Sequence, residues 1–220
     1  MQFGNKITFS IAADGSSASG KTTGSKFIAK KFGFKFLSSG KLYRYLALRI
    51  IKNNGKYNYK FIRKVTKKIV TKKLKSKQLY NPKVTKLSSI ISQKKYIRNS
   101  LKKFQLNFIL KNRKVIIEGR DIATKIMPKA DLKLFFKCSI KESAKRRLKE
   151  FKKINSNITQ KEVQNALIQR NLMDTTRKIS PLRKLKNSVL VDTTNLSIKE
   201  MEVKLTKLVL KTLKKKYGNL

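Results

Sequence analysis

Short apolar runs alternate with longer amphipathic segments along most of the chain. The apolar runs predict strands at residues 6–13, 34–37, 115–118, 132–138 and 188–192. Helical spacing follows at residues 22–31, 41–52, 59–73, 85–110, 140–153, 159–175 and 196–215. Residues 74–84, which include Pro82, fit either irregular structure or a short β segment. Strands that alternate with helices predict a mostly parallel, five-stranded sheet covered by helices on both faces.

The composition limits both the size and the chemistry of the protein. A chain of 220 residues suits one domain, or one domain with a small lobe. A single cysteine, Cys138, excludes an internal disulfide framework, and the absence of histidine excludes histidine catalysis and histidine metal ligation. No apolar run approaches the length of a membrane span, and the first residues lack the apolar core of a signal peptide. We therefore expect a soluble, cytoplasmic monomer.

The charge is strongly unbalanced. Lys and Arg number 56 against 11 Asp and Glu, giving a formal net charge of +45. The lysines occur in nearly every predicted element, which favours a compositional origin over a dedicated nucleic-acid surface. Both interpretations remain open, and non-specific nucleic-acid binding through net charge is compatible with either. In both cases the positive field attracts anions, nucleotides included.

The segment between the first predicted strand and the first predicted helix matches a phosphate-binding loop. Its pattern is G-x-x-x-x-G-K-[ST], followed by a second threonine. It consists of Gly15, Ser16, Ser17, Ala18, Ser19, Gly20, Lys21, Thr22 and Thr23. The glycines allow a tight turn that points backbone N–H groups at a phosphate, the lysine reaches the outer phosphates, and Thr22 can approach Mg²⁺. The strand before and the helix after are the context that this motif requires.

Two further groups carry candidate chemistry. Arg120 and Asp121 follow the strand at residues 115–118, at the sheet edge where open α/β proteins bind ligands. Arg170, Asp174 and Arg177 are spaced i, i+4 and i+7, which places them on one helical face. A solvated helix could show the same spacing.

In these residues the chain resembles bacterial cytidylate kinase, a family of P-loop nucleoside monophosphate kinases. Five segments carry the resemblance and occur in the expected order. They are Ile11–Thr23, Phe36–Arg44, Ile117–Phe135, Ser143–Arg147 and Gln169–Thr194. The phosphate loop alone would indicate only a superfamily, whereas the Ser-Gly-x-x-Tyr-Arg, Gly-Arg-Asp and Arg-x-x-x-Asp-x-x-Arg motifs are much more specific.

The resemblance implies a three-layer P-loop kinase fold and an ATP- and Mg²⁺-dependent transfer of phosphate to CMP or dCMP. It implies a core at about 1–54 and 106–220, an inserted acceptor-binding lobe at about 55–105, and a lid at about 147–160. For the acceptor it implies base contacts by Ser39, Arg98 and Asp121, phosphate contacts by Arg44, Arg120 and Arg177, and ribose contacts by Arg170, Asp174 and Ser89. It implies that Arg146 and Arg147 balance charge on the transferring group beside Lys21.

The chain departs from the family pattern in several places. Ser38 and Asn171 stand where the family usually has Asp, Ser16 and Ala18 replace a Pro and a Gly of the loop, and the insertion is short. Two alternatives therefore stay open at this point. One is a related kinase with another acceptor, such as UMP, AMP or shikimate, and the other is a nucleic-acid-binding protein on a degenerate kinase scaffold.

Overall fold

The computed structural model describes residues 7–152 and 158–218. The chain divides into two compact units. The first contains the residues up to Leu37 and those from Arg113 onward, and the second is Ser38–Asn112. The predicted acceptor lobe, residues 55–105, falls within the second unit. Within the described ranges, no helix combines the length and the apolar composition needed to cross a bilayer.

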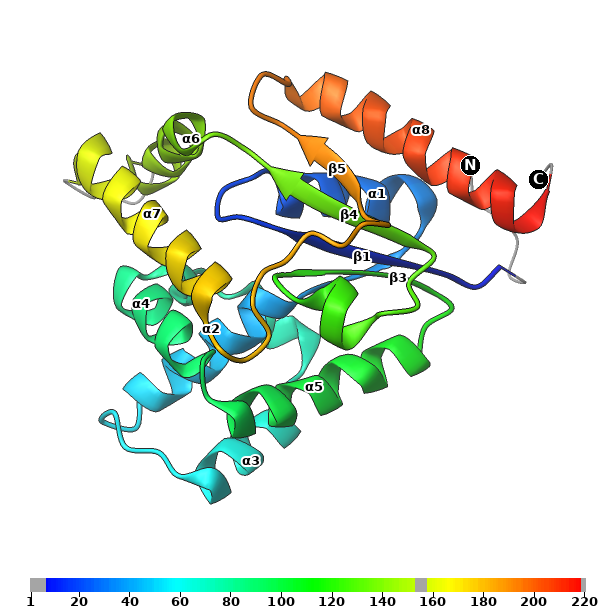
Figure 1. Cartoon of the computed structure of the whole chain (residues 1–220). Coiled ribbons are helices and arrows are strands. Elements are labelled where there is room, and N and C mark those ends of the chain that lie inside the picture. Colours follow the sequence, from blue (N-terminus) through cyan, green and yellow to red (C-terminus); the bar gives the residue numbers. More distant parts are fainter. Residues whose placement is uncertain (1–6, 153–157, 219–220) are drawn as a thin grey trace. The chain divides into compact units, whose positions relative to one another are not determined.

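The first unit is built on a parallel sheet of five strands (Figure 1). The strands are β1 (Phe9–Gly15), β2 (Lys35–Ser38), β3 (Lys114–Gly119), β4 (Leu132–Lys137) and β5 (Val189–Asp192). Their order across the sheet is β2-β3-β1-β4-β5, which places β1 at the centre. In the register, Asp14 lies opposite Gly119 and Gly15 opposite Phe136. The carboxyl ends of β1, β3 and β4 therefore meet at one edge, where the phosphate loop begins.

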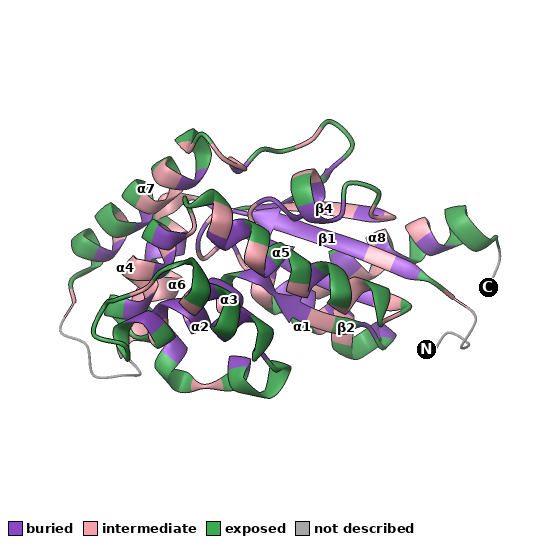
Figure 2. Cartoon of the chain, turned by 90° about the horizontal axis from the view of Figure 1, so that it is seen from below, coloured by how far each residue is buried: buried purple, intermediate pink, exposed green. Residues whose placement is uncertain are grey.

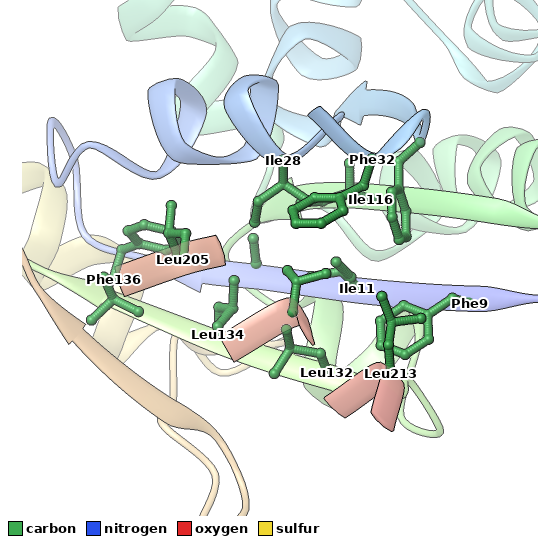
Figure 3. Close-up of a cluster of buried hydrophobic side chains, with 14 of the residues drawn as sticks. Phe9, Ile11, Ile28, Phe32, Ile116, Leu132, Leu134, Phe136, Leu205 and Leu213 are labelled. Carbon is green, nitrogen blue, oxygen red and sulfur yellow. The ribbon is translucent and has the colours of Figure 1, made fainter. Parts of the chain in front are cut away.

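The main core lies between this sheet and two helices, α1 (Lys21–Phe32) and α8 (Ile198–Tyr217). Alternate residues of β1 and β4 point into it, including Phe9, Ile11, Leu134 and Phe136, and all four are almost fully buried. Figure 3 shows these side chains packed beneath Ile28 of α1 and beside the α8 residues. Burial of this apolar surface fixes α1, and with it Lys21 at the helix start, against the sheet.

Two helices and one short π-helix complete the first unit. The helices α6 (Ile140–Lys152) and α7 (Gln160–Thr176) pack through Ala144, Val163 and Leu167. The predicted lid, residues 147–160, comprises the end of α6 and the start of α7 in the sequence. Residues 153–157 of this segment lie outside the described ranges. The π-helix η3 (Ile122–Ile126) directly follows Asp121 and packs against β1 and β3. The sequence pattern did not predict it.

Apart from Ser38, the last residue of β2, the regular secondary structure of the second unit is helical. It contains α2 (Ser39–Ile51), α3 (Tyr59–Lys67), the 3₁₀ turns η1 (Thr71–Lys75) and η2 (Lys77–Tyr80), α4 (Pro82–Ile91) and α5 (Lys95–Leu110). Of the two alternatives left open for residues 74–84, irregular structure or a short β segment, the β segment is wrong. Leu74 and Leu79 are buried through the 3₁₀ turns, and Asn81 caps α4 by accepting a hydrogen bond from Lys83 N, with Pro82 at the first helical position.

The expectation of one helix over residues 85–110 is also wrong, because the chain breaks between Ile91 and Lys95. Arg98 donates a hydrogen bond of 2.8 Å to the carbonyl of Ser92, which satisfies a backbone acceptor at the end of α4. The helix predicted at 59–73 likewise ends at Lys67. The strands β1 and β3 are buried along most of their length, whereas these helices expose one face (Figure 2).

Candidate active site

The phosphate loop connects β1 to α1 at the carboxyl edge of the sheet. Gly15 has a φ of +152°, and a Cβ there would lie 2.2 Å from the carbonyl oxygen of Phe136, so only glycine fits between β1 and β4. Ala18, where the family has glycine, adopts a left-handed φ of 56°. The loop thus keeps the turn that its sequence predicts despite that substitution.

Lys21, the first residue of α1, is almost fully buried. Its ammonium group donates to the carbonyl of Ser16 at 3.1 Å and lies 3.9 Å from Oε2 of Glu118. Burial lowers the pKa of Lys21 to about 7, and the nearby charge of Arg120 lowers it further, whereas Glu118 opposes the shift. Because burial disfavours the ammonium charge of Lys21, an anion that pairs with it would stabilise the charged form.

Glu118 is a functional candidate that the sequence analysis missed. It lies near the end of β3, and its Oε2 atom accepts a hydrogen bond of 3.0 Å from the Thr22 hydroxyl. A carboxylate oxygen and a hydroxyl oxygen therefore lie side by side next to Lys21. The signal in the sequence was an acidic residue at the end of a buried strand.

Asp174 of α7 holds two of the predicted phosphate-binding arginines. Its Oδ2 accepts from Arg120 Nε at 2.7 Å, and its Oδ1 accepts from Arg177 Nη1 at 3.1 Å. Burial alone would raise the pKa of the Asp174 carboxyl, but the charges of Arg120, Arg170 and Arg177 hold it below its ordinary value. The motif spacing of α7 therefore corresponds to a real cluster and not to a solvated helix face.

This cluster contacts the phosphate loop through Ser17. Arg120 Nη2 donates to the Ser17 hydroxyl at 3.0 Å, and the backbone N–H of Ser17 donates to Oδ1 of Asn171 at 3.1 Å. Asn171 lies on α7 and replaces the family's aspartate while retaining an acceptor oxygen. The sequence motifs do not indicate Asn171 as a site residue, because its contact with the loop depends on how α7 packs beside that loop.

Arg146 and Arg147 of α6 have different surroundings. Arg146 pairs with Glu142 at 3.0 Å and donates to the hydroxyl and the carbonyl of Thr193. Thr193, after β5, in turn contacts the carbonyl of Ser19 at 3.1 Å, so Arg146 is joined to the phosphate loop by one intervening residue. Arg147 instead pairs with the exposed Glu150.

Asp121 is buried in the first unit, directly before η3, and the four remaining predicted residues belong to the second unit. Ser39 is buried at the start of α2, and Arg44 of the same helix lies over the ring of Tyr80 at 5.1 Å. Arg98 of α5 is buried and lies over the ring of Tyr43 at 5.6 Å. The hydroxyl of Ser89 donates to the carbonyl of Thr85 within α4.

Comparisons with known proteins agree with this arrangement. The family model for cytidylate kinase matches residues 11–211. A protein from Fusobacterium nucleatum subsp. nucleatum, named cytidylate kinase, is 37% identical over 87% of this chain and 92% of its own length. Another of that name from Thermosipho melanesiensis is 34% identical over 90% of this chain and 95% of its own length.

Among solved structures, TT1252 from Thermus thermophilus has a similar fold. It aligns with a TM-score of 0.54 at 16% identity, over 94% of this chain and 99% of that one. The predicted P-loop kinase fold, with a five-stranded parallel sheet flanked by helices, is confirmed. The match of the family model over most of the chain, together with these relatives, shows that the chain belongs to the cytidylate kinase family.

Proposed function

We propose that the chain transfers the γ-phosphoryl group of ATP to CMP or dCMP, which gives ADP and CDP or dCDP. The observation that carries the proposal is the cluster at the carboxyl edge of the sheet, where Lys21 of the phosphate loop lies near Arg120. Arg120 in turn shares the Asp174 carboxylate with Arg177. Phosphoryl transfer relies on positioning and electrostatic stabilisation, so a chain without histidine can perform it.

In this proposal the phosphate loop holds the donor. The amides from Ser16 to Thr23 and the ammonium group of Lys21 bind the phosphates of ATP, because a loop that ends in a helix N-terminus favours negative charge. Substrate phosphates would replace the Ser16 carbonyl as the partner of Lys21. Arg146 and Arg147 would balance charge on the transferring group.

Arginine side chains at the carboxyl edge of the sheet would bind the acceptor phosphate. Arg120 and Arg177 can pair with phosphate oxygens in a bidentate manner, and Asp174 fixes their orientation. The family resemblance assigns Arg44 to the same phosphate. Arg170 and Asp174, with Ser89, would bind the ribose hydroxyls.

Base selection would rest on Asp121, with Ser39 and Arg98. A carboxylate accepts a hydrogen bond from the exocyclic amine of cytosine, whereas uracil presents a carbonyl there and is repelled. Asp121 is buried, which strengthens the discrimination because a charge in a shielded environment cannot easily exchange its partner for water.

A magnesium ion fits the residues that are present. Thr22 and Glu118 place a hydroxyl and a carboxylate oxygen together beside the loop, and oxygen ligands suit Mg²⁺. The described residues contain no group of three acidic, cysteine or histidine side chains that could hold a metal. We propose that the ion is bound mainly by nucleotide phosphates and water. When bound, the ion would neutralise developing charge on the phosphates.

Replacement of Lys21 tests the proposal. We expect Lys21→Ala to reduce ADP formation from ATP and CMP by at least about a thousandfold, because it removes a charge that contacts the phosphates throughout the transfer. Lys26→Ala is the matched control, since Lys26 is an exposed lysine on the same helix. Equal activity of the two folded variants would refute the assignment of the phosphate loop.

A further inference from the structure

Asp14 is a buried carboxylate to which neither the motifs nor the proposed chemistry assigns a function. It is the residue before Gly15, at the end of β1, and its exposed fraction is 2%. Its two oxygens accept separate backbone hydrogen bonds, Oδ1 from Ile122 N at 2.9 Å and Oδ2 from Ala123 N at 2.7 Å. One side chain thus connects two segments that are 108 residues apart in the sequence.

These two segments are the ones that carry the candidate chemistry. The phosphate loop begins directly after Asp14, and the two bound amides directly follow Arg120 and Asp121. Arg120 extends from that backbone to the Ser17 hydroxyl and to Asp174. A shift of the backbone at residues 120–123 would therefore move both the guanidinium and the carboxylate relative to the loop.

We propose that Asp14 is a positioning residue for the transfer reaction, whose carboxylate fixes the Arg120–Asp121 segment to the start of the phosphate loop. Asp14 contacts neither nucleotide in this account and acts through the backbone of η3. The inference rests on the proposed function for its kinetic test, but the hydrogen bonds that it invokes can be tested without activity.

The environment of Asp14 makes its two backbone hydrogen bonds sensitive to pH. Burial raises the pKa of Asp14 to about 6, against the two backbone N–H groups, which lower it. The charged groups that act on it are Asp121, which raises its pKa further, and Lys21, which lowers it. At pH 8 both oxygens accept, whereas protonation below pH 6 converts one of them into a hydroxyl that faces an N–H donor.

Asp14→Asn reproduces the protonated state at every pH, because its amide nitrogen cannot accept a hydrogen bond. The variant should fold, since a raised pKa means that the folded state disfavours the charged form, and asparagine carries no charge. Asp131→Asn is the matched control. Asp131 also accepts a backbone hydrogen bond from β1, from Ser10 N at 2.7 Å, but at the opposite end of the strand.

We expect kcat/KM for CMP at pH 8 to fall by about tenfold or more in Asp14→Asn, with Tm unchanged or higher. In Asp131→Asn we expect kcat/KM to stay within about twofold while Tm falls, because that contact only stabilises the fold. The ratio of wild-type to Asp14→Asn kcat/KM should decrease as the pH falls through about 6. This ratio cancels the ionisation of the substrate phosphate, which occurs in the same range.

Amide hydrogen exchange supplies the readout that does not depend on turnover. The amides of Ile122 and Ala123 should exchange faster in Asp14→Asn than in the wild-type protein and in Asp131→Asn. Unchanged protection there, or a loss of activity only in proportion to a lower Tm, would overturn the inference. A wild-type protein that shows no turnover with CMP would instead refute the proposed function, and the exchange result would still decide the inference.

Discussion

Asp174 is a buried carboxylate that pairs with two arginines at once. One of its oxygens accepts a hydrogen bond from Arg120 and the other accepts one from Arg177, and all three side chains are largely shielded from water. Neutralising such a group leaves two guanidinium charges without their anionic partner, which is more costly than the loss of an exposed pair.

We predict that Asp174→Asn lowers the free energy of unfolding by about 3 kcal/mol at pH 7. The charges of the three arginines hold the pKa of Asp174 below its ordinary value, so its stabilisation is present above the unfolded pKa of about 3.8 and is lost as the pH falls through the folded value. Urea unfolding of both proteins between pH 7 and pH 3 measures the effect. The difference between them should shrink below about pH 4.

Glu150→Gln provides the comparison for this prediction. Glu150 pairs with Arg147 at 2.7 Å, but 62% of its side chain is exposed. Its replacement should therefore cost no more than about 0.5 kcal/mol. If Asp174→Asn cost as little as Glu150→Gln, or if its cost stayed constant down to pH 3, Asp174 would not stabilise the arginine pair in the way that the geometry indicates.

At the scale of elements, Thr193 connects the end of β5 to the phosphate loop by a hydrogen bond. Its hydroxyl is within hydrogen-bonding distance of the carbonyls of Ser19 and Lys137 and accepts from Arg146. The side chain is almost fully buried. The conformation of the loop therefore depends on a residue from the other end of the sequence.

We predict that Thr193→Val raises KM for ATP several-fold and leaves KM for CMP nearly unchanged. The shape of the side chain is kept, but its hydrogen bond to the Ser19 carbonyl of the loop is lost, together with those to Lys137 and Arg146. Steady-state kinetics with each substrate varied in turn provide the measurement. Thr194→Val is the control, because the adjacent hydroxyl contacts Asp192 and Ser139 and not the loop. Equal increases of KM for ATP in both variants would contradict this function of Thr193.

The sequence predicted the elements of the sheet unit well, because each strand is a short apolar run and each helix between strands has a regular polar face. In the second unit it predicted α2 and the start of α3, but not where the later helices end and begin. There the break between α4 and α5 carries neither glycine nor proline and is stabilised by Arg98, a contact that depends on the fold. Local patterns contain no information about such contacts, nor about the π-helix that follows Asp121.

The same distinction applies to the candidate site. The residues of the motifs were predictable because phosphate binding requires glycine, lysine and arginine at fixed spacings. Glu118, Asn171, Thr193 and Asp14 were not, since each supports a motif residue from a distant part of the chain. The assignments of individual residues to ATP, CMP or Mg²⁺ stay predictions in both units.

At the scale of the whole molecule, the acidic residues are unevenly distributed. No Asp or Glu occurs between Asp14 and Glu118, so every charged side chain of the second unit is Lys or Arg. No ion pair can therefore form within that unit. Repulsion between like charges destabilises a compact state, and salt screens it.

We predict that raising NaCl from about 20 to 300 mM increases Tm by about 2–4 °C, because the screening length falls below the spacing of most surface charges. Differential scanning calorimetry measures the shift, and sucrose at equal osmolality controls for solvent effects that do not depend on charge. A decrease of Tm with NaCl would mean that attraction, and not repulsion, dominates the charges of the folded protein.

The most direct test of the account is ADP formation from ATP and Mg²⁺ with CMP, dCMP, UMP and AMP assayed in parallel at moderate salt. We predict turnover with CMP and dCMP far above that with UMP and AMP, because the proposed function assigns Asp121 to the exocyclic amine of cytosine. Preferential turnover with UMP or AMP would contradict the assignment of the acceptor site. No turnover with any acceptor, from a folded protein that binds RNA at physiological salt, would contradict the proposed function itself.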